Sequence, residues 1–299
     1  TLAQVPDCIA AGVASYKLYM AYDRLRLDDG GLLRVLARLR GCGGRALVHA
    51  ENHYAIAYLV ARTLAEGRTG PENHPHTRPD VMEAEAIHRL LALAWVTSTP
   101  LVVAHLSSAL GLEQVRAARA RGQTVWAETC PQYLLLDEGV YRQPGFEAAK
   151  FVMAPPPRTL ADRSALWAGL GAGEIDTVAT DHCPFFFETQ KVRGRDDFSR
   201  IPGGAPGIET RLALMYSHGV RPGHISPSRW VEICCTAPAR CFGLAPRKGT
   251  LATGADADVV LFDPEKRVVL SQPALHQNVD YTPYEGWEVR GYPVIVISQ

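Results

Sequence analysis

The sequence predicts an α/β fold in which parallel strands alternate with helices and a smaller all-β region follows. Over residues 1 to about 225, short apolar runs alternate with longer amphipathic stretches, the pattern of repeated βα units. After about residue 240, short strands follow one another with turn residues and no helices between them. The chain has 299 residues, 47% of them hydrophobic, enough to bury a sizeable core.

Five apolar runs are the expected strands of the parallel sheet. They are short, rich in β-branched and aromatic residues, and separated by the amphipathic stretches. The runs cover residues 15–21, 46–50, 101–107, 124–129 and 177–182.

The stretches between these runs have helical periodicity. Leu32, Leu36 and Leu39, for example, recur at the spacing of one helix face. Gly41 and Gly122 are expected to cap two of the helices. The predicted helices cover residues 30–40, 52–66, 80–97, 109–121 and 160–171.

The C-terminal region predicts a small β-domain. A turn-rich segment, residues 249–258, precedes apolar runs at 259–263, 267–270 and 288–297. We therefore expect one βα domain over residues 1–240 and part of a small β-domain over residues 241–299.

Charge and cysteine content limit the possible partners and location. Lys plus Arg is 31 and Asp plus Glu is 31, so the formal net charge is +0, which favours a small molecule over nucleic acid or an anionic membrane. The seven cysteines show no paired zinc spacing and indicate free thiols in a reducing compartment. No run reaches the roughly 20 apolar residues of a membrane span, and the N-terminus does not resemble a signal peptide. We expect a cytoplasmic protein.

Polar residues lie on or at the ends of four predicted strands: Lys17, His49, His105 and Asp181. Parallel βα barrels build their active sites at the C-terminal ends of the strands. A single histidine there is usually a hydrogen-bonded core residue, but four such side chains together indicate a site.

Lys17 is the most informative of the four. Burial of an ammonium within an apolar strand should lower its pKa and favour the neutral amine. A neutral amine can add carbon dioxide and form an anionic carbamate that bridges two divalent cations. The alternative is a lysine whose stem packs on Tyr19 while its ammonium reaches solvent. The residues alone leave both interpretations open.

Ordered motifs along nearly the whole chain resemble the D-hydantoinase/dihydropyrimidinase family of cyclic amidohydrolases. They are YKLYMAY at 16–22, VHAEN at 48–52, VAHLS at 103–107, ETCPQY at 128–133, TDHCP at 180–184, QK at 190–191, IPGG at 201–204, PRKGT at 246–250, GADAD at 254–258 and NVDYTPYEG at 278–286. The resemblance implies a (βα)8 TIM-type barrel of the amidohydrolase type plus part of a small β-sandwich. Since five strands are visible and such a barrel has eight, we expect this chain to lack the N-terminal strands and to be a piece of a longer protein.

The resemblance also implies the metal site and the reaction. Lys17 matches the lysine that is carboxylated to bridge two divalent metals, usually zinc. His49 and His105 match the histidines on one metal, and Asp181 the carboxylate on the other, which also moves the proton. A hydroxide that bridges the metals would attack the ring amide, and the Tyr22 hydroxyl would support the developing oxyanion.

Two positions in the expected substrate site depart from the family pattern. Ala154 stands where a serine usually precedes the double proline, and Gly203 where an asparagine often follows Ile-Pro. The family resemblance implies that main-chain groups there hold the substrate's amide edge, so the chemistry should survive. Leu25 and Leu27 resemble residues that shape the pocket for the ring substituent; the alternative is that they cover the barrel rim.

Relatives carry a His-x-His metal motif at the end of the first barrel strand. None of the strands predicted from this sequence carries such a motif, and its one His-x-His lies elsewhere. His74-Pro75-His76 lies in a proline-rich loop, so we expect a solvated segment or one that supports the site from behind. We expect His182 to support the site without binding metal. The 299-residue chain alone should therefore have little or no activity.

Other functions within the same fold remain open. An allantoinase or dihydroorotase would share the chemistry, and a non-catalytic dihydropyrimidinase-related scaffold protein would share the fold. Retention of Lys17, His49, His105 and Asp181 disfavours the scaffold. The resemblance implies a small cyclic amide or ureide as substrate and a homotetramer.

Overall fold

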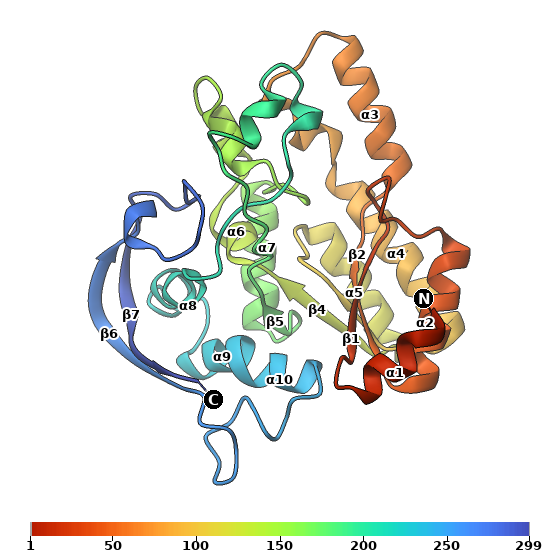
Figure 1. Ribbon diagram of the computed structural model, residues 1–299, viewed down its shortest axis with the longest axis vertical. Coiled ribbons are helices and arrows are strands. Elements are labelled where there is room, and N and C mark those ends of the chain that lie inside the picture. Colours follow the sequence, from red (N-terminus) through yellow and green to blue (C-terminus); the bar gives the residue numbers. More distant parts are fainter. Residues whose placement is uncertain (1, 299) are drawn as a thin grey trace.

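The protein forms a five-stranded parallel sheet flanked by helices, with a two-stranded antiparallel ribbon beside it (Figure 1). The computed structural model describes residues 2–298. Each strand pairs with the next in chain order, which is the order of strands in a βα barrel. The predicted fold class is confirmed. The strands are β1 Ser15–Tyr19, β2 Arg45–His49, β3 Leu101–Val103, β4 Val125–Thr129 and β5 Thr177–Val178.

The register of the first two strands decides which side chains meet on the inner face. Lys17 pairs with Leu47 and Tyr19 with His49. Because side chains alternate between the faces of a strand, Lys17, Tyr19 and His49 share one face. Leu18 points the other way and is buried in the core beneath the helices.

The five predicted helices all form: α2 Asp29–Cys42, α3 His53–Ala65, α4 Asp80–Thr97, α5 Ala109–Ala120 and α7 Leu160–Gly171. Asp28 caps α2 by accepting a hydrogen bond from the Gly31 amide at 2.6 Å. The expected cap at Gly41 is wrong, because α2 continues and ends at Gly43 in a left-handed conformation. Shorter helices are α1 Val5–Ala10, α6 Pro131–Leu135, α8 Arg211–Met215, α9 Pro227–Val231 and α10 Ala237–Cys241.

The C-terminal ribbon consists of β6 Val259–Val269 and β7 Glu288–Ile297. The separate strands expected at 259–263 and 267–270 are one strand, interrupted by an irregularity between Asp263 and Arg267. The Phe262 ring packs on Tyr216 and Trp230, which joins the ribbon to the helices that follow the sheet. The division into domains at about residue 240 stays a prediction.

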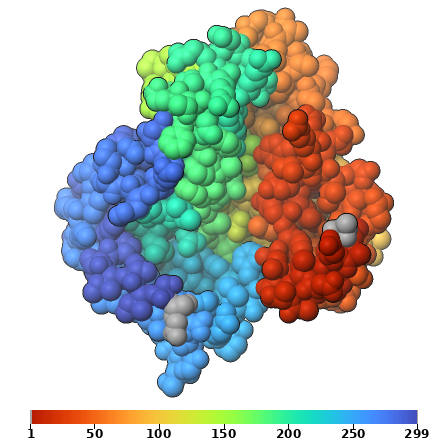
Figure 2. Space-filling model, viewed as in Figure 1, coloured from red at the N-terminus to blue at the C-terminus, as the bar shows by residue number. Residues whose placement is uncertain are grey.

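Figure 2 shows the N-terminal elements (red) and the C-terminal ribbon (blue) on opposite sides of the central segment drawn in green. All seven cysteines are free. Among residues 2–298, no helix combines the length and apolarity that crossing a bilayer requires.

Candidate active site

The four predicted residues lie on or just beyond four different strands. Lys17 is in the middle of β1 and His49 ends β2. The predicted strands at 101–107 and 177–182 are shorter than expected, so His105 and Asp181 lie in the segments that follow β3 and β5. His49, His105 and Asp181 thus lie at or just beyond the C-terminal ends of their strands, whereas Lys17 lies within β1.

Backbone conformation sets three of the predicted residues apart. Tyr22, His105 and Asp181 have positive φ angles of 74°, 38° and 46°, and Ser98 is the one other such non-glycine residue within 2–298. A left-handed conformation costs an L-residue roughly 1–2 kcal/mol. Such strain is typical of functional sites, where the surrounding structure holds a side chain in one direction.

His49 and His105 face each other across neighbouring strands. The His49 Nδ1 lies 3.0 Å from the His105 Nε2, and both rings are buried. The other nitrogen of His49, Nε2, is 2.8 Å from the Glu51 carboxylate. This contact favours the tautomer with the proton on Nε2 and leaves the Nδ1 lone pair facing His105.

This pair fits a metal ion. Two nitrogen ligands at the usual zinc distance in tetrahedral geometry lie about 3.3 Å apart, close to the observed separation. A ligating histidine usually donates its second N–H to a carboxylate, as His49 does to Glu51. Among residues 2–298, no three His, Cys, Asp or Glu side chains are grouped closely enough to hold a metal ion by themselves.

Lys17 lies beside carboxylates. Burial lowers the pKa of Lys17, against the opposing effects of Asp181 and Glu128, so the predicted direction is confirmed. Its Nζ is 5.7 Å from the centre of the Tyr19 ring. Burial raises the pKa of Glu128 to about 7, with Lys17 opposing the rise. Glu128 was assigned no role from the sequence, although it belongs to a quoted motif on β4.

Tyr22 packs on His49 and lies beside a buried ion pair. Its ring centre is 4.9 Å from that of His49, and the Arg78 guanidinium is 5.9 Å from the Tyr22 ring. Arg78 donates to Glu51 at 2.6 Å. Burial raises the pKa of Glu51, but Arg78 and His49 outweigh it and bring that pKa to about 2. Burial also raises the pKa of Tyr22, so its hydroxyl remains a hydrogen-bond donor.

The loops that carry Ala154 and Gly203 are joined to each other. The Gly204 amide donates to the Val152 carbonyl at 3.0 Å. A Cβ atom added at Gly203 would meet nothing within 4 Å, so the departure from asparagine leaves open space there. Ala154 is buried.

A cavity of about 750 Å³ opens beside Tyr22. Leu25 lines it together with Arg78 and an apolar wall from α3, which consists of Ile56, Val60 and Leu64. Leu27 does not line the cavity but packs against the core, so the interpretation as a pocket residue fits Leu25 alone.

His74 and His182, two other histidines singled out from the sequence, have structural partners. His74 is buried and its Nε2 contacts the Met153 carbonyl at 2.8 Å, so it is not solvated. Burial lowers the pKa of His74 to about 3, which keeps the ring neutral and makes Nε2 the donor. His182 accepts the amides of Gly207 and Ile208 through Nδ1.

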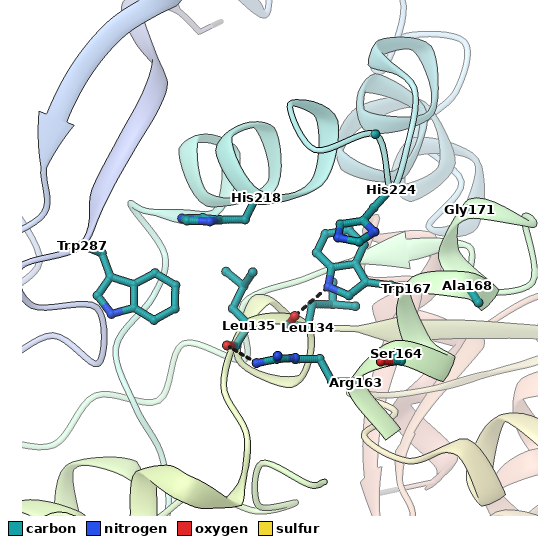
Figure 3. A pocket seen from close by; sticks show the side chains of 11 residues that line it. Leu134, Leu135, Arg163, Ser164, Trp167, Ala168, Gly171, His218, His224 and Trp287 are labelled. Atoms are coloured by element: carbon teal, nitrogen blue, oxygen red, sulfur yellow. Dashed lines mark hydrogen bonds between the residues drawn. The ribbon is translucent and has the colours of Figure 1, made fainter. Parts of the chain in front are cut away.

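A second cavity, of about 620 Å³, lies between α6, α7 and Trp287 (Figure 3). The Trp167 ring stacks on His224 at 4.9 Å and its Nε1 donates to the Leu134 carbonyl at 2.7 Å. None of the predicted site residues lines this cavity. The candidate site is therefore the cluster at the strand ends.

The known proteins that this chain resembles in sequence and fold are amidohydrolases, most of them hydantoinases. The amidohydrolase family model matches residues 158–299. The D-hydantoinase of Streptomyces coelicolor is 45% identical over 300 residues, and the D-phenylhydantoinase of Escherichia coli O81 is 44% identical over 299. Both alignments cover 100% of this chain and 64% of the relative, so the chain spans just under two thirds of these relatives.

The solved structures that superpose on this chain include enzymes of the same group. D-hydantoinase from Bacillus sp. AR9 superposes with a TM-score of 0.97 at 45% identity, covering 99% of this chain and 65% of that one. Dihydropyrimidinase from Brevibacillus agri superposes with a TM-score of 0.97 at 43% identity and the same coverage. L-hydantoinase from Arthrobacter aurescens reaches 0.92 at 32% identity, covering 99% of this chain and 66% of that one.

Proposed function

Since this chain is related over its whole length to the D-hydantoinases and dihydropyrimidinases of the amidohydrolase family, we propose that the protein hydrolyses the ring amide of hydantoins or dihydropyrimidines. The observation that carries the proposal is the His49–His105 pair, whose nitrogens face each other 3.0 Å apart beside Lys17. A non-catalytic scaffold would have no need to keep two buried imidazoles aimed at one point.

The donor set suits two divalent cations, with zinc preferred. His49 and His105 would hold one cation through Nδ1 and Nε2. Lys17 as a carbamate and Asp181 would complete the site; the neutral amine attacks the carbon of CO2, an N–C bond forms and one N–H proton leaves to solvent. The bound cations would polarise the ring carbonyl and supply an activated water at neutral pH.

The chain's own residues would guide the reaction. Asp181 accepts a proton from the attacking water and delivers it to the ring nitrogen as the C–N bond breaks. The Tyr22 hydroxyl, kept protonated by burial, donates to the oxyanion that develops on the carbonyl oxygen. Their left-handed backbones aim both side chains before substrate arrives.

The cavity beside Tyr22 would take the substituent on the ring. Its wall of Ile56, Val60 and Leu64 is apolar, and Leu25 lies at its rim. An apolar substituent at carbon 5 of the ring would pack on this wall, although Asp23, Arg24 and Arg78 also line the cavity.

The test is a substrate panel. The part of the Streptomyces coelicolor relative that this chain does not match is fused to the chain, and the zinc-loaded fusion is assayed with a 5-substituted hydantoin, dihydrouracil, allantoin and dihydroorotate. We expect turnover of the first two, lost in His105→Ala and retained in His88→Ala, a matched change at an exposed histidine of α4. Turnover of allantoin or dihydroorotate alone would contradict the proposal, as would an inactive fusion beside an active relative.

The 299-residue chain alone should show little or no turnover, because its sequence has no His-x-His strand motif. Substantial hydrolysis of a 5-substituted hydantoin by this chain would contradict that expectation.

A further inference from the structure

Lys191 is a lysine with no solvent exposure, and the proposed chemistry does not use it. It begins a short 3₁₀ helix, Lys191–Gly194, in the segment that follows Asp181. Its Nζ donates to the carbonyl of Val152 at 2.9 Å and to that of Pro202 at 3.0 Å. Within residues 2–298, no carboxylate pairs with it.

The two acceptors belong to the two loops of the proposed substrate site. Val152 lies just before Ala154, and Pro202 directly precedes Gly203. The Val152 carbonyl also accepts the Gly204 amide at 3.0 Å, so both loops and Lys191 meet at this one oxygen. Lys191 thus ties together the main-chain positions that are expected to hold the substrate.

Three further carbonyls in and beside the first loop accept hydrogen bonds from side chains elsewhere in the chain. The donors are Tyr141 to Phe151 at 2.9 Å, His74 to Met153 at 2.8 Å and Tyr133 to Pro155 at 2.9 Å. These three side chains are buried. These bonds restrain the first loop, and Lys191 joins it to the loop of Gly203.

Burying the Lys191 ammonium costs desolvation free energy. Burial lowers the pKa of Lys191 to about 7, with Cys183 opposing the shift. An apolar side chain of similar length would avoid the desolvation cost. What an apolar side chain lacks is a donor group that can bond two carbonyls at once.

We propose that Lys191 is a positioning residue for substrate binding: by bonding the carbonyls of Val152 and Pro202, it sets the separation between the main-chain groups of Ala154 and Gly203 that hold the ring amide. The role in substrate binding rests on the proposed function, whereas the tether between the loops does not. Because Ala154 and Gly203 offer no polar side chain, recognition there depends on main-chain placement.

The tether is tested by hydrogen–deuterium exchange on the 299-residue chain. Lys191→Met is compared with Lys266→Met, a matched change at an exposed lysine of the ribbon. The loss of two charge-assisted bonds should speed exchange about tenfold in peptides that contain residues 152–154 and 203–205. Exchange in the core helix α4 should stay unchanged. Unchanged exchange in both loops, or equal acceleration throughout the chain, would overturn the tether.

The role in binding is tested by the KM for dihydrouracil of the zinc-loaded fusion described under Proposed function. Lys191→Met should raise KM about tenfold, and Lys191→Gln, which keeps N–H donors, should recover part of this loss. Lys191→Gln also replaces Lys191→Met in both tests if the latter does not fold. Equal KM in the wild type and both variants would overturn the positioning role. If the wild-type fusion does not turn over dihydrouracil while the relative from Streptomyces coelicolor does, the proposed function is contradicted, and the exchange experiment still decides the tether.

Discussion

Replacing His74 with glutamine should make the protein less sensitive to mild acid. His74 is buried, and burial, assisted by Arg78, lowers its pKa to about 3, against an ordinary value of 6.5. Between these two values the unfolded chain carries a proton that the folded protein does not. The stability from the neutral ring is therefore complete above the unfolded pKa and is lost as the pH falls toward the folded one.

The size of the effect follows from the two pKa values. From about pH 7 to about pH 5, the linkage relation gives a loss of about 2 kcal/mol of unfolding free energy from this one group. Glutamine can still donate to the Met153 carbonyl but does not titrate, so His74→Gln should lose about 2 kcal/mol less than the wild type over that interval.

The assay is urea unfolding of both proteins at the two pH values. Tyr133→Phe is the control, because it removes a neighbouring bond to the Pro155 carbonyl without changing a group that titrates in this interval. It should lower stability about equally at both pH values. An identical pH dependence for the wild type and His74→Gln would refute the claim that His74 is buried in its neutral form.

Three further changes test the site and its loops. Glu51→Gln removes the carboxylate that holds His49, so zinc affinity measured by chelator competition should fall about 10–100-fold; unchanged affinity would show that the contact does not matter. In the fusion, Lys17→Ala should abolish metal binding and activity and be partly rescued by short carboxylic acids, as measured by metal analysis; unaltered metal content would rule out the carbamate. Gly204→Ala places a Cβ atom in collision with the Cys183 carbonyl and should cost about 3 kcal/mol in urea unfolding, whereas Gly203→Ala should cost little; equal losses would contradict the packing argument.

The alternation of strands and helices could be predicted because hydrophobic periodicity is local. The five parallel strands and the five long helices all appeared near their expected positions. The ends of β3 and β5 could not be predicted, because His105 and Asp181 take left-handed conformations that apolar runs do not encode. Lys17 was identifiable since an ammonium within an apolar strand is unusual in any sequence.

Contacts between distant segments account for what the sequence did not reveal. His74 lies among prolines and polar residues, a composition typical of an exposed loop, yet it bonds a carbonyl 79 residues away. Lys191 had a weak signal, since it is one of five lysines and follows an apolar Phe-Phe-Phe run, but its two acceptors lie in separate loops. Leu25 and Leu27 look alike in sequence, and only packing separates the cavity residue from the core residue.

The most direct test of the metal site is a crystal structure of the chain grown with zinc and bicarbonate, with anomalous scattering recorded at the zinc edge. The account predicts an anomalous peak within about 2.1 Å of both the His49 Nδ1 and the His105 Nε2, with extra density for a carbamate on the Lys17 Nζ. An unmodified Lys17 with no anomalous peak between the two imidazoles would contradict it.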